Sequence, residues 1–253
     1  LEDTGGTGLN VSSTNTVDFY AGPTGIYKIN DDLASTTAIA GDRTMLTISR
    51  FDQYNNVVDI GVDTVYLYDN APVGTTAFYN AASEGTQISS ALILDGSSSV
   101  DVWFVGNQSG SWTVSASDNI DAPDALGISD DVIYVDITPA DTARLELNDP
   151  GDMFNGTRLG YTVTRYDAFD NLVTAGSENY YLYSNATGTS TAFYDAAIDG
   201  TLIDNISIED GQSTANFWYY ESENGIWTVY VSDNSGGPDG ADRRGGPATG
   251  QAA

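Results

Sequence analysis

TVTRYDAFDNLV (residues 162–173) decides how this chain folds, because a close copy, TISRFDQYNNVV (residues 47–58), occurs 115 residues earlier. In each copy, apolar and polar residues alternate and then give way to a stretch rich in Asp and Asn. Such alternation is typical of a half-buried β-strand, and the Asp and Asn residues that follow favour a tight turn. The stretch therefore predicts a strand that enters a hairpin, and the chain contains it twice.

The same 115-residue spacing relates other parts of the chain. VYLYDN (residues 65–70) matches YYLYSN (residues 180–185), and WTVSASDN (residues 112–119) matches WTVYVSDN (residues 227–234). A repeat of this length corresponds to a whole domain, whereas solenoid units are much shorter. The pair Val17-Asp18 matches Val135-Asp136 with a spacing of 118 residues, and we interpret it as the opening strand of each domain.

Seven or eight short alternating runs, separated by Gly, Pro, Asn and Asp, occur in the first copy. Many short strands with turn residues between them indicate a β-sandwich. The predicted strands cover residues 17–20, 26–29, 43–52, 64–68, 75–79, 88–94, 98–105 and 111–117. We therefore predict an all-β chain of two tandem Ig-like antiparallel β-sandwich domains. The predicted parts are an N-terminal linker (1–16), a first sandwich (17–124), a second sandwich (125–234) and a Gly-, Pro- and Asp-rich tail without strands (235–253).

The composition limits the partners. Thirty-six acidic residues against eight basic ones give a net charge of −28, and both halves of the chain are acidic. Such a surface repels nucleic acid and anionic membranes, so neither is an expected partner. The chain has no apolar run of about 18 residues, so we expect no membrane insertion. Because it begins at Leu1 without an initiator Met, we expect a processed product or a fragment.

The chain contains no Cys and no His, which excludes thiol nucleophiles, Ser-His-Asp catalysis, disulfides and the usual zinc ligands. Carboxylates are so frequent that spacing alone selects no acid/base pair. We therefore predict that the chain is not an enzyme.

A family resemblance follows from these motifs. The order aromatic-Asp-x-x-(Asn/Asp)-Asn, a late Gly-x-Trp-Thr-Val strand and an Asp-rich link into Val-Asp-Ile-Thr-Pro resemble the bacterial Ig-like tandem repeats of cell-surface proteins, of the invasin/intimin or filamin-like type. AFYDAA (residues 192–197) and FWYY (residues 217–220) also resemble large bacterial extracellular repeat proteins. The resemblance covers nearly all of residues 17–234. It implies an extracellular location at a prokaryotic cell surface, and a spacer or adhesive role with copies of itself or other surface proteins as partners.

Within the repeated motif, the Asp and Asn side chains have two interpretations. They can supply oxygen ligands to a cation, or they can hydrogen-bond the backbone of their own turn, which we favour. The Arg of the motif faces inward, and we expect an ion pair with an Asp of the turn. The residues concerned are Arg50, Asp52 and Asn56 in the first copy, and Arg165, Asp167, Asp170 and Asn171 in the second.

The Asp-rich stretches after each Trp-Thr-Val strand are candidate calcium sites, at what we interpret as domain junctions. Calcium takes six to eight oxygen ligands, and such stretches are rich in carboxylates and amides. The spacing does not match an EF-hand, so a solvated acidic linker is the alternative. The candidate ligands are Asp118, Asn119, Asp121 and Asp124 in the first copy, and Asp233, Asn234 and Asp239 in the second.

The phase of the strands separates two groups of aromatic residues. Trp112 and Trp227 fall on the apolar side and are predicted core residues. A second group falls on the outward side and predicts one aromatic sheet face that stacks sugar rings or a neighbouring subunit, unless the segment after Phe78 folds over it. This group consists of Trp103, Tyr66 and Tyr68, and of Trp218, Tyr181 and Tyr183.

Five Asn-x-Ser/Thr sequons allow glycosylation, at Asn10, Asn107, Asn155, Asn185 and Asn205. Together, these features predict a non-enzymatic structural or adhesive protein: a rigid tandem spacer that assembles into a surface filament, layer or adhesin stalk. The alternative is a carbohydrate-binding module that uses the outward Trp and Tyr residues.

Overall fold

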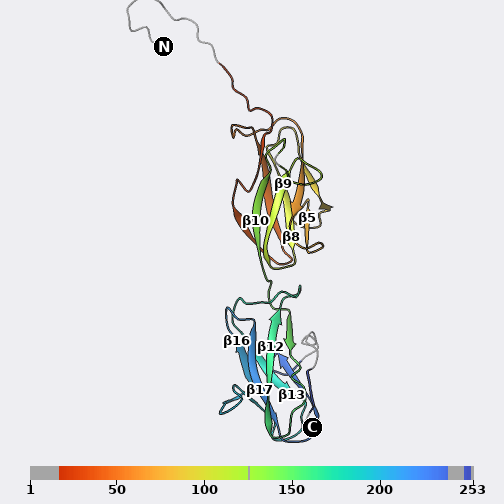
Figure 1. Ribbon diagram of the computed structural model, residues 1–253, viewed down its shortest axis with the longest axis vertical. Helices are drawn as coiled ribbons and strands as arrows, with labels where there is room; N and C mark the ends of the chain where they lie inside the picture. Colours follow the sequence, from red (N-terminus) through yellow and green to blue (C-terminus); the bar gives the residue numbers. More distant parts are fainter. Residues whose placement is uncertain (1–16, 125, 239–247, 252–253) are drawn as a thin grey trace, which may run out of the picture.

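Two β-sandwiches, placed end to end, account for residues 17–124, 126–238 and 248–251, the parts of the chain that the computed structural model describes (Figure 1). Each sandwich consists of two facing sheets, so the chain is a tandem pair of Ig-like β-sandwich domains, as predicted. Within the described ranges, no helix is long and apolar enough to cross a membrane.

The first domain contains two five-stranded sheets. One sheet has the order β1 (Ile26–Ile29), β3 (Arg43–Phe51), β8 (Ser99–Gly106), β5 (Thr76–Tyr79) and β6 (Gln87–Ile88). The other has the order β2 (Ser35–Ile39), β10 (Asp131–Thr138), β9 (Gly110–Ser117), β4 (Asp63–Asp69) and β7 (Ser90–Ile93). Neighbouring strands are antiparallel except β2 and β10, which are parallel.

The second domain repeats this arrangement. One sheet has the order β11 (Arg144–Leu147), β12 (Thr157–Tyr166), β17 (Thr214–Glu221), β14 (Ala192–Tyr194) and β15 (Leu202–Ile203). The other has the order β16 (Asn205–Ile208), β13 (Glu178–Ser184), β18 (Ile226–Ser232) and β19 (Ala248–Gln251). The strands that enter the repeated motif, β3 and β12, therefore occupy the same position in the two domains.

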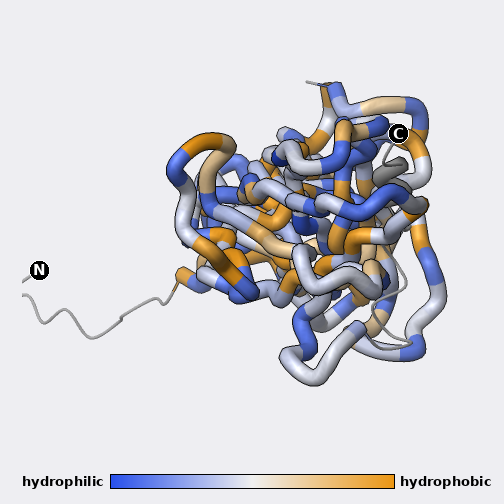
Figure 2. The backbone as a smooth tube through the Cα atoms, turned by 90° about the horizontal axis from the view of Figure 1, so that it is seen from below, coloured by the Kyte–Doolittle hydropathy of each residue, from blue (hydrophilic) through white to orange (hydrophobic). Residues whose placement is uncertain are grey.

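The core lies between the sheets, where every second side chain points inward. Buried and less buried residues alternate along strands such as β3, and Figure 2 shows hydrophobic and hydrophilic stretches mixed along the whole backbone. On β3, Leu46 and Ile48 are buried, and on β12 Val163 is buried. Trp112 and Trp227, which we predicted to be core residues, are only half-buried. Trp112 packs against the first core cluster, and each indole also lies against the glycine two residues before it, Gly110 or Gly225.

The strand that we assigned to the opening of the second domain belongs to the first. Strand β10 pairs with β9 and β2, and it buries Ile133, Val135 and Ile137 in the first core. The predicted division between 17–124 and 125–234 is therefore wrong for this strand. Its earlier copy, Val17–Tyr20, forms no strand in the first domain and is exposed. The repeating unit of the sequence is thus shifted by one strand from the unit that folds.

The predicted strand-free tail, 235–253, also contains a strand. β19 pairs with β18 where β10 pairs with β9: Gly250 lies opposite Trp227, as Val135 lies opposite Trp112. A β-ladder is made by backbone groups, so a stretch rich in Gly and Ala can form one without strand-favouring side chains.

Candidate functional site at the joint between the domains

The two domains meet through the repeated motif of the second domain. Its Asn171 reaches the turn between β8 and β9 of the first domain, and only 7% of the residue is exposed. The side-chain oxygen accepts a hydrogen bond from Ser109 N at 2.8 Å, and Nδ2 donates one to Asn107 O at 2.7 Å. Because a buried amide hydrogen-bonded on both sides has a fixed orientation, this side chain sets how the turn sits on the second domain.

Asp167 holds the motif loop and the linker together. Its Oδ1 accepts hydrogen bonds from the backbone N of Phe169 (2.8 Å) and of Asn171 (2.9 Å). Its Oδ2 accepts from Asn171 Nδ2 (2.8 Å) and from Ala140 N (3.0 Å). Burial alone raises the pKa of Asp167, but these hydrogen bonds outweigh it and lower the pKa below its ordinary value. The turn interpretation of the motif is thus what the geometry shows.

Phe169 makes the apolar contact of the joint. Its ring lies against Gly41, between β2 and β3 of the first domain, so closely that a Cβ on that residue would collide with it. Gly41 has a φ of +83°, which glycine adopts without strain. Glycine is therefore required here both for the backbone conformation and for the space that Phe169 fills.

The outer end of the first domain carries the same loop. Asp52 Oδ1 accepts hydrogen bonds from the backbone N of Tyr54 and Asn56, each at 2.9 Å, and Oδ2 accepts from Gly22 N at 3.0 Å. Hydrogen bonds, first from the Asn56 side chain and then from Gly22 N, lower the pKa of Asp52 from 3.8 to about 2. The loop geometry is thus the same with and without a neighbouring domain.

Each motif arginine is fully buried and binds backbone carbonyls. Arg50 donates to four of them (of Val58, Gly61, Leu94 and Ser97) and pairs with Asp63 at 3.0 Å. Arg165 donates to the carbonyls of Val173, Gly176 and Gln212, and its partner is Glu178, at 3.5 Å. The predicted inward ion pair exists in both copies, but the acid lies at the start of the next strand and not in the turn.

The first Asp-rich stretch does not lie at the joint. Because β9 and β10 are antiparallel, the loop between them lies at the end of the first domain away from the second (Figure 1). There the Asn119 amide donates to Asp124 at 2.8 Å, Asp121 N donates to Asn119 at 3.1 Å, and Asp118 accepts from Ile128 N at 3.2 Å. Asp118 Oδ1, Asp130 Oδ1 and the Tyr27 hydroxyl are buried without a hydrogen-bond partner.

The second Asp-rich stretch follows β18, at the end of the second domain that faces the first. Asn234 O accepts a hydrogen bond from the Tyr183 hydroxyl at 2.7 Å. Asp233 and Asn234 lie in the described part of the chain, whereas Asp239 lies outside it. Within the described residues, no group of three or more acidic side chains is placed to hold a metal ion.

The outward aromatic residues do not form one face. Trp103 and Trp218 lie on β8 and β17, whereas the four Tyr residues lie on β4 and β13. These strands belong to the two different sheets of each sandwich, so their outward side chains point in opposite directions. The prediction of a joint Trp and Tyr platform is therefore wrong, because strand phase reports inward or outward but does not report which sheet a strand joins.

Each Trp instead lies in a row across its own sheet. Trp103 pairs with Met45 on one side and Tyr79 on the other, and the Arg43 guanidinium stacks 3.7 Å from the Tyr79 ring. In the second domain the corresponding stack is Arg158 over Tyr194, at 3.3 Å. The segment after Phe78 does not fold over Trp103, because its strand β5 lies beside β8 in the same sheet.

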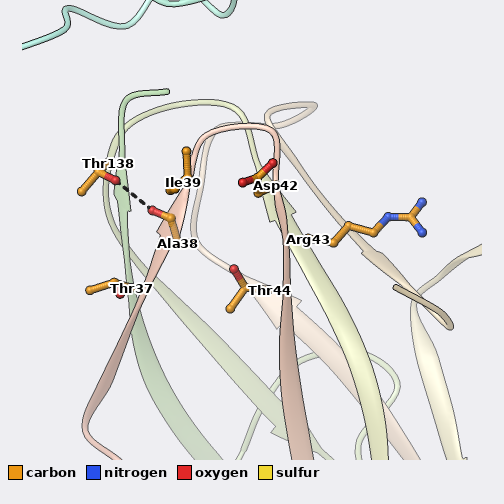
Figure 3. Close-up of a pocket in the computed structure, with 7 residues that line it drawn as sticks. All are labelled: Thr37, Ala38, Ile39, Asp42, Arg43, Thr44 and Thr138. Carbon is orange, nitrogen blue, oxygen red and sulfur yellow. Dashed lines mark hydrogen bonds between the residues drawn. The ribbon is translucent and has the colours of Figure 1, made fainter. Parts of the chain in front are cut away.

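A surface hollow of about 490 Å³ lies near the joint, between β2, the start of β3 and the end of β10 (Figure 3). Three Thr residues line it together with Ala38, Ile39, Asp42 and Arg43. Arg43 points away from it, toward Ala81 O, to which it donates a hydrogen bond at 2.7 Å. The hollow therefore offers no convergent set of polar groups for a ligand.

Four of the five sequon residues are described, and Asn10 lies outside the described part. Asn107, Asn155, Asn185 and Asn205 are all exposed. Asn107 lies in the turn that contacts Asn171, and the Asn185 side chain accepts a hydrogen bond from Thr228 N at 2.7 Å. Glycosylation therefore stays a prediction for these residues.

The fold defines a tandem Ig-like β-sandwich protein, and solved structures of such domains resemble it. The chain is similar to the Escherichia coli adhesin FdeC (16% identity, TM-score 0.44), over 91% of this chain and 65% of that one, which is less than two thirds of its length. It is similar to domains 5–6 of the S-layer protein SbsC (14% identity, TM-score 0.31; 84% of this chain and 92% of that one).

A glycoside hydrolase family 2 member from Bacteroides cellulosilyticus is also similar (10% identity, TM-score 0.32), over 76% of this chain and 23% of that one. No protein-family model matches the chain, and no curated protein matches it in sequence. At these identities the likeness concerns the fold alone, so function is argued below from the geometry of this chain.

Proposed function

We propose that this chain is a rigid spacer in a prokaryotic cell-surface protein, with a structural or adhesive role and no enzymatic activity. Its two sandwiches hold a fixed angle, and such units build a surface filament, a layer or an adhesin stalk from copies of the chain or with other surface proteins. The resemblance of the repeated motifs to bacterial surface repeats supports an extracellular setting, and the high negative charge disfavours nucleic acid as a partner.

The joint is the observation that carries this proposal. A flexible tether would leave the domains without mutual contacts. Here a linker of five residues joins β10 to β11, and its Ala140 N donates a hydrogen bond to Asp167. Across the joint, Asn171 makes two hydrogen bonds to the first domain, and Phe169 packs on Gly41. Polar and apolar contacts together limit both rotation and bending of one domain against the other.

Small-angle X-ray scattering at low concentration tests the spacer. We expect the wild type to scatter as one rod of fixed length, and the double variant Phe169→Ala/Asn171→Ala to show a broader, shorter distribution of distances. The matched control is Tyr54→Ala/Asn56→Ala, which removes the corresponding aromatic and amide side chains from the outer end of the first domain. We expect it to leave the scattering unchanged. Scattering of the wild type that requires many interdomain angles would overturn the proposal.

We include a calcium ion in this proposal at one place, the outer end of the first domain. The buried, unpartnered oxygens of Asp118, Asp130 and Tyr27 are the observation that supports it, because a cation would give them a partner. Thermal unfolding with calcium and with EGTA tests it. We expect calcium to raise the melting temperature of the wild type but not that of Asp118→Asn. Equal melting temperatures of the wild type with calcium and with EGTA would contradict the calcium site.

A further inference from the structure

We propose that copies of this chain join head to tail, with the outer end of the first domain of one copy docked on the outer end of the second domain of another. This inference rests on the proposed spacer function and names its partner. Its basis is the internal joint: the chain carries both halves of that joint a second time, one half at each outer end.

The first half is the loop of Asp52, Tyr54 and Asn56. It corresponds residue by residue to Asp167, Phe169 and Asn171, and the hydrogen bonds inside the two loops are the same. Phe169 covers a glycine, whereas 76% of Tyr54 is exposed. Asn171 bonds the neighbouring domain, whereas the Asn56 amide donates only to Asp52 and the residue is exposed. An aromatic ring and an amide are thus already positioned for a second domain.

The second half lies at the far end of the second domain. Gly156 corresponds to Gly41: its φ is +75°, and its N donates to Glu221 O at 2.8 Å, as Gly41 N donates to Gly106 O at 3.0 Å. The space beside Gly41 is filled by Phe169, whereas the space beside Gly156 is open. This opening is where the Tyr54 ring of a second copy fits.

The turn that would meet Asn56 also keeps its shape. In the first domain, the Trp112 indole donates to Gln108 O at 3.1 Å, and the turn offers Asn107 O and Ser109 N to Asn171. In the second domain, the Trp227 indole donates to Glu223 O at 3.2 Å. The corresponding backbone groups are Ser222 O and Asn224 N. Ser222 O already accepts a long hydrogen bond from Asn155 Nδ2, at 3.4 Å, and a carbonyl oxygen can accept a second one.

Residues 17–20 supply the strand that accompanies this joint. They match Val135–Thr138, the part of β10 that closes the first domain and runs into the internal joint. Val17 and Phe19 are 71% and 92% exposed, which is costly for apolar residues of a strand-like stretch. We infer that in the assembly this segment pairs with β18 of the other copy, with Val17 opposite Trp227, and replaces β19.

The position that such a strand would take in the second domain is the one that β19 holds beside β18. In the first domain, the corresponding strand β10 contributes Ile133 and Val135 to the core cluster. β19 has Ala248 and Gly250 at the corresponding positions. A donated strand would place Val17 where β19 has Gly250, and the Val side chain supplies apolar surface that Gly lacks.

Two positions limit the correspondence. The first is Asn15, which corresponds in sequence to Ile133, a fully buried residue of the first core. The second lies at Gly106. Ile137 packs against Gly106, but the residue that corresponds to Gly106 in the second domain is Glu221. Its carboxylate accepts hydrogen bonds from Ser190 and Thr191 at 2.7 Å and 2.6 Å. Phe19 therefore cannot follow the path of Ile137, and Val17 is the residue that tests strand donation.

Sedimentation across a wide concentration range tests the assembly. We expect the wild type to form linear multimers as concentration rises, and Val17→Asp and Tyr54→Ala/Asn56→Ala to remain monomeric. The matched control is Val73→Asp, which places the same charge on a fully exposed residue outside both outer ends. A wild type that stays monomeric up to millimolar concentration, or a Val17→Asp variant that associates as the wild type does, would overturn the proposal.

Disulfide trapping identifies the contact itself, because the natural chain contains no Cys. The variant Asn56→Cys/Asn224→Cys should give a ladder of multimers on non-reducing gels, whereas Asn56→Cys/Val73→Cys should not. Equal ladders from both variants would contradict head-to-tail docking. The scattering test of the internal joint uses dilute monomers, so failure of this inference and failure of the spacer are distinguishable.

Discussion

At the residue scale, the buried arginines show why an inward-facing charge can be structural. Arg50 donates hydrogen bonds to backbone carbonyls of two separate segments, 58–61 and 94–97, so it ties together two loops at one end of the first sandwich. Strand phase alone predicts that this side chain points inward. Its partners lie up to 47 residues away in sequence, and no local pattern indicates them.

Replacing Arg50 with Met tests this role. The apolar side chain fills much of the space but removes the hydrogen bonds that Arg50 donates to Asp63 and to four carbonyls, so we expect a loss of about 3–5 kcal/mol in the free energy of unfolding of the first domain. Urea unfolding measures it. Arg144→Met is the control: this arginine is partly exposed and pairs with exposed acids, so about 0–1 kcal/mol is expected. Equal losses would contradict the structural role of Arg50.

Asp52 makes stability depend on acid in a direction that the hydrogen bonds determine. Its pKa is lowered from 3.8 to about 2 in the folded protein, so the folded state favours the charged form. The contribution is therefore present above the ordinary pKa and is lost as pH falls from 4 toward 2. In Asn56→Ala the largest cause is absent, so the pKa should rise toward its ordinary value. NMR titration of the Asp52 carboxyl measures this, and an unchanged midpoint in the variant would contradict it.

At the element scale, strand positions follow from alternation, but strand partners do not. The runs at residues 26–29, 88–94 and 111–117 predict β1, the pair β6 and β7, and β9. The parallel pairing of β2 with β10 joins residues about 100 apart, as Tyr134 with Ser35, and β2 lacks a clear alternation. The joint was missed for the same reason: the fold brings Asn171 and Ser109 together, and the motif that contains Asn171 indicated only a turn.

The assignment of β10 to the first domain has a direct test. Ile133 is fully buried in the first core, so Ile133→Ala should destabilise that domain by about 2–4 kcal/mol. Its neighbour Val132 is 47% exposed, and Val132→Ala should change stability by less than about 1 kcal/mol. Hydrogen exchange followed by peptide mapping reports each domain separately. If Ile133→Ala lowered the protection of β12 and β17 and not that of β3 and β8, the assignment of β10 to the first domain would be contradicted.

At the scale of the whole molecule, the tandem arrangement and the charge act against each other. A net charge of −28 is spread over two domains that contact only at their ends, so like charges repel within each sandwich and between copies. The contacts of the joint are short-range and include a buried amide and an aromatic ring, which salt screens little. Salt should therefore remove the repulsion and leave the attraction.

This balance predicts that sodium chloride raises the melting temperature of both domains and strengthens head-to-tail association, since screening over about 10 Å at 0.1 M acts on the exposed carboxylates. Differential scanning calorimetry and sedimentation at increasing salt measure the two effects. Tyr54→Ala/Asn56→Ala should keep the salt-dependent melting but lose the salt-dependent association, because it alters the docking loop and leaves the net charge unchanged. Association that weakens as salt rises would show that ion pairs between copies, and not the shared joint geometry, hold the assembly together.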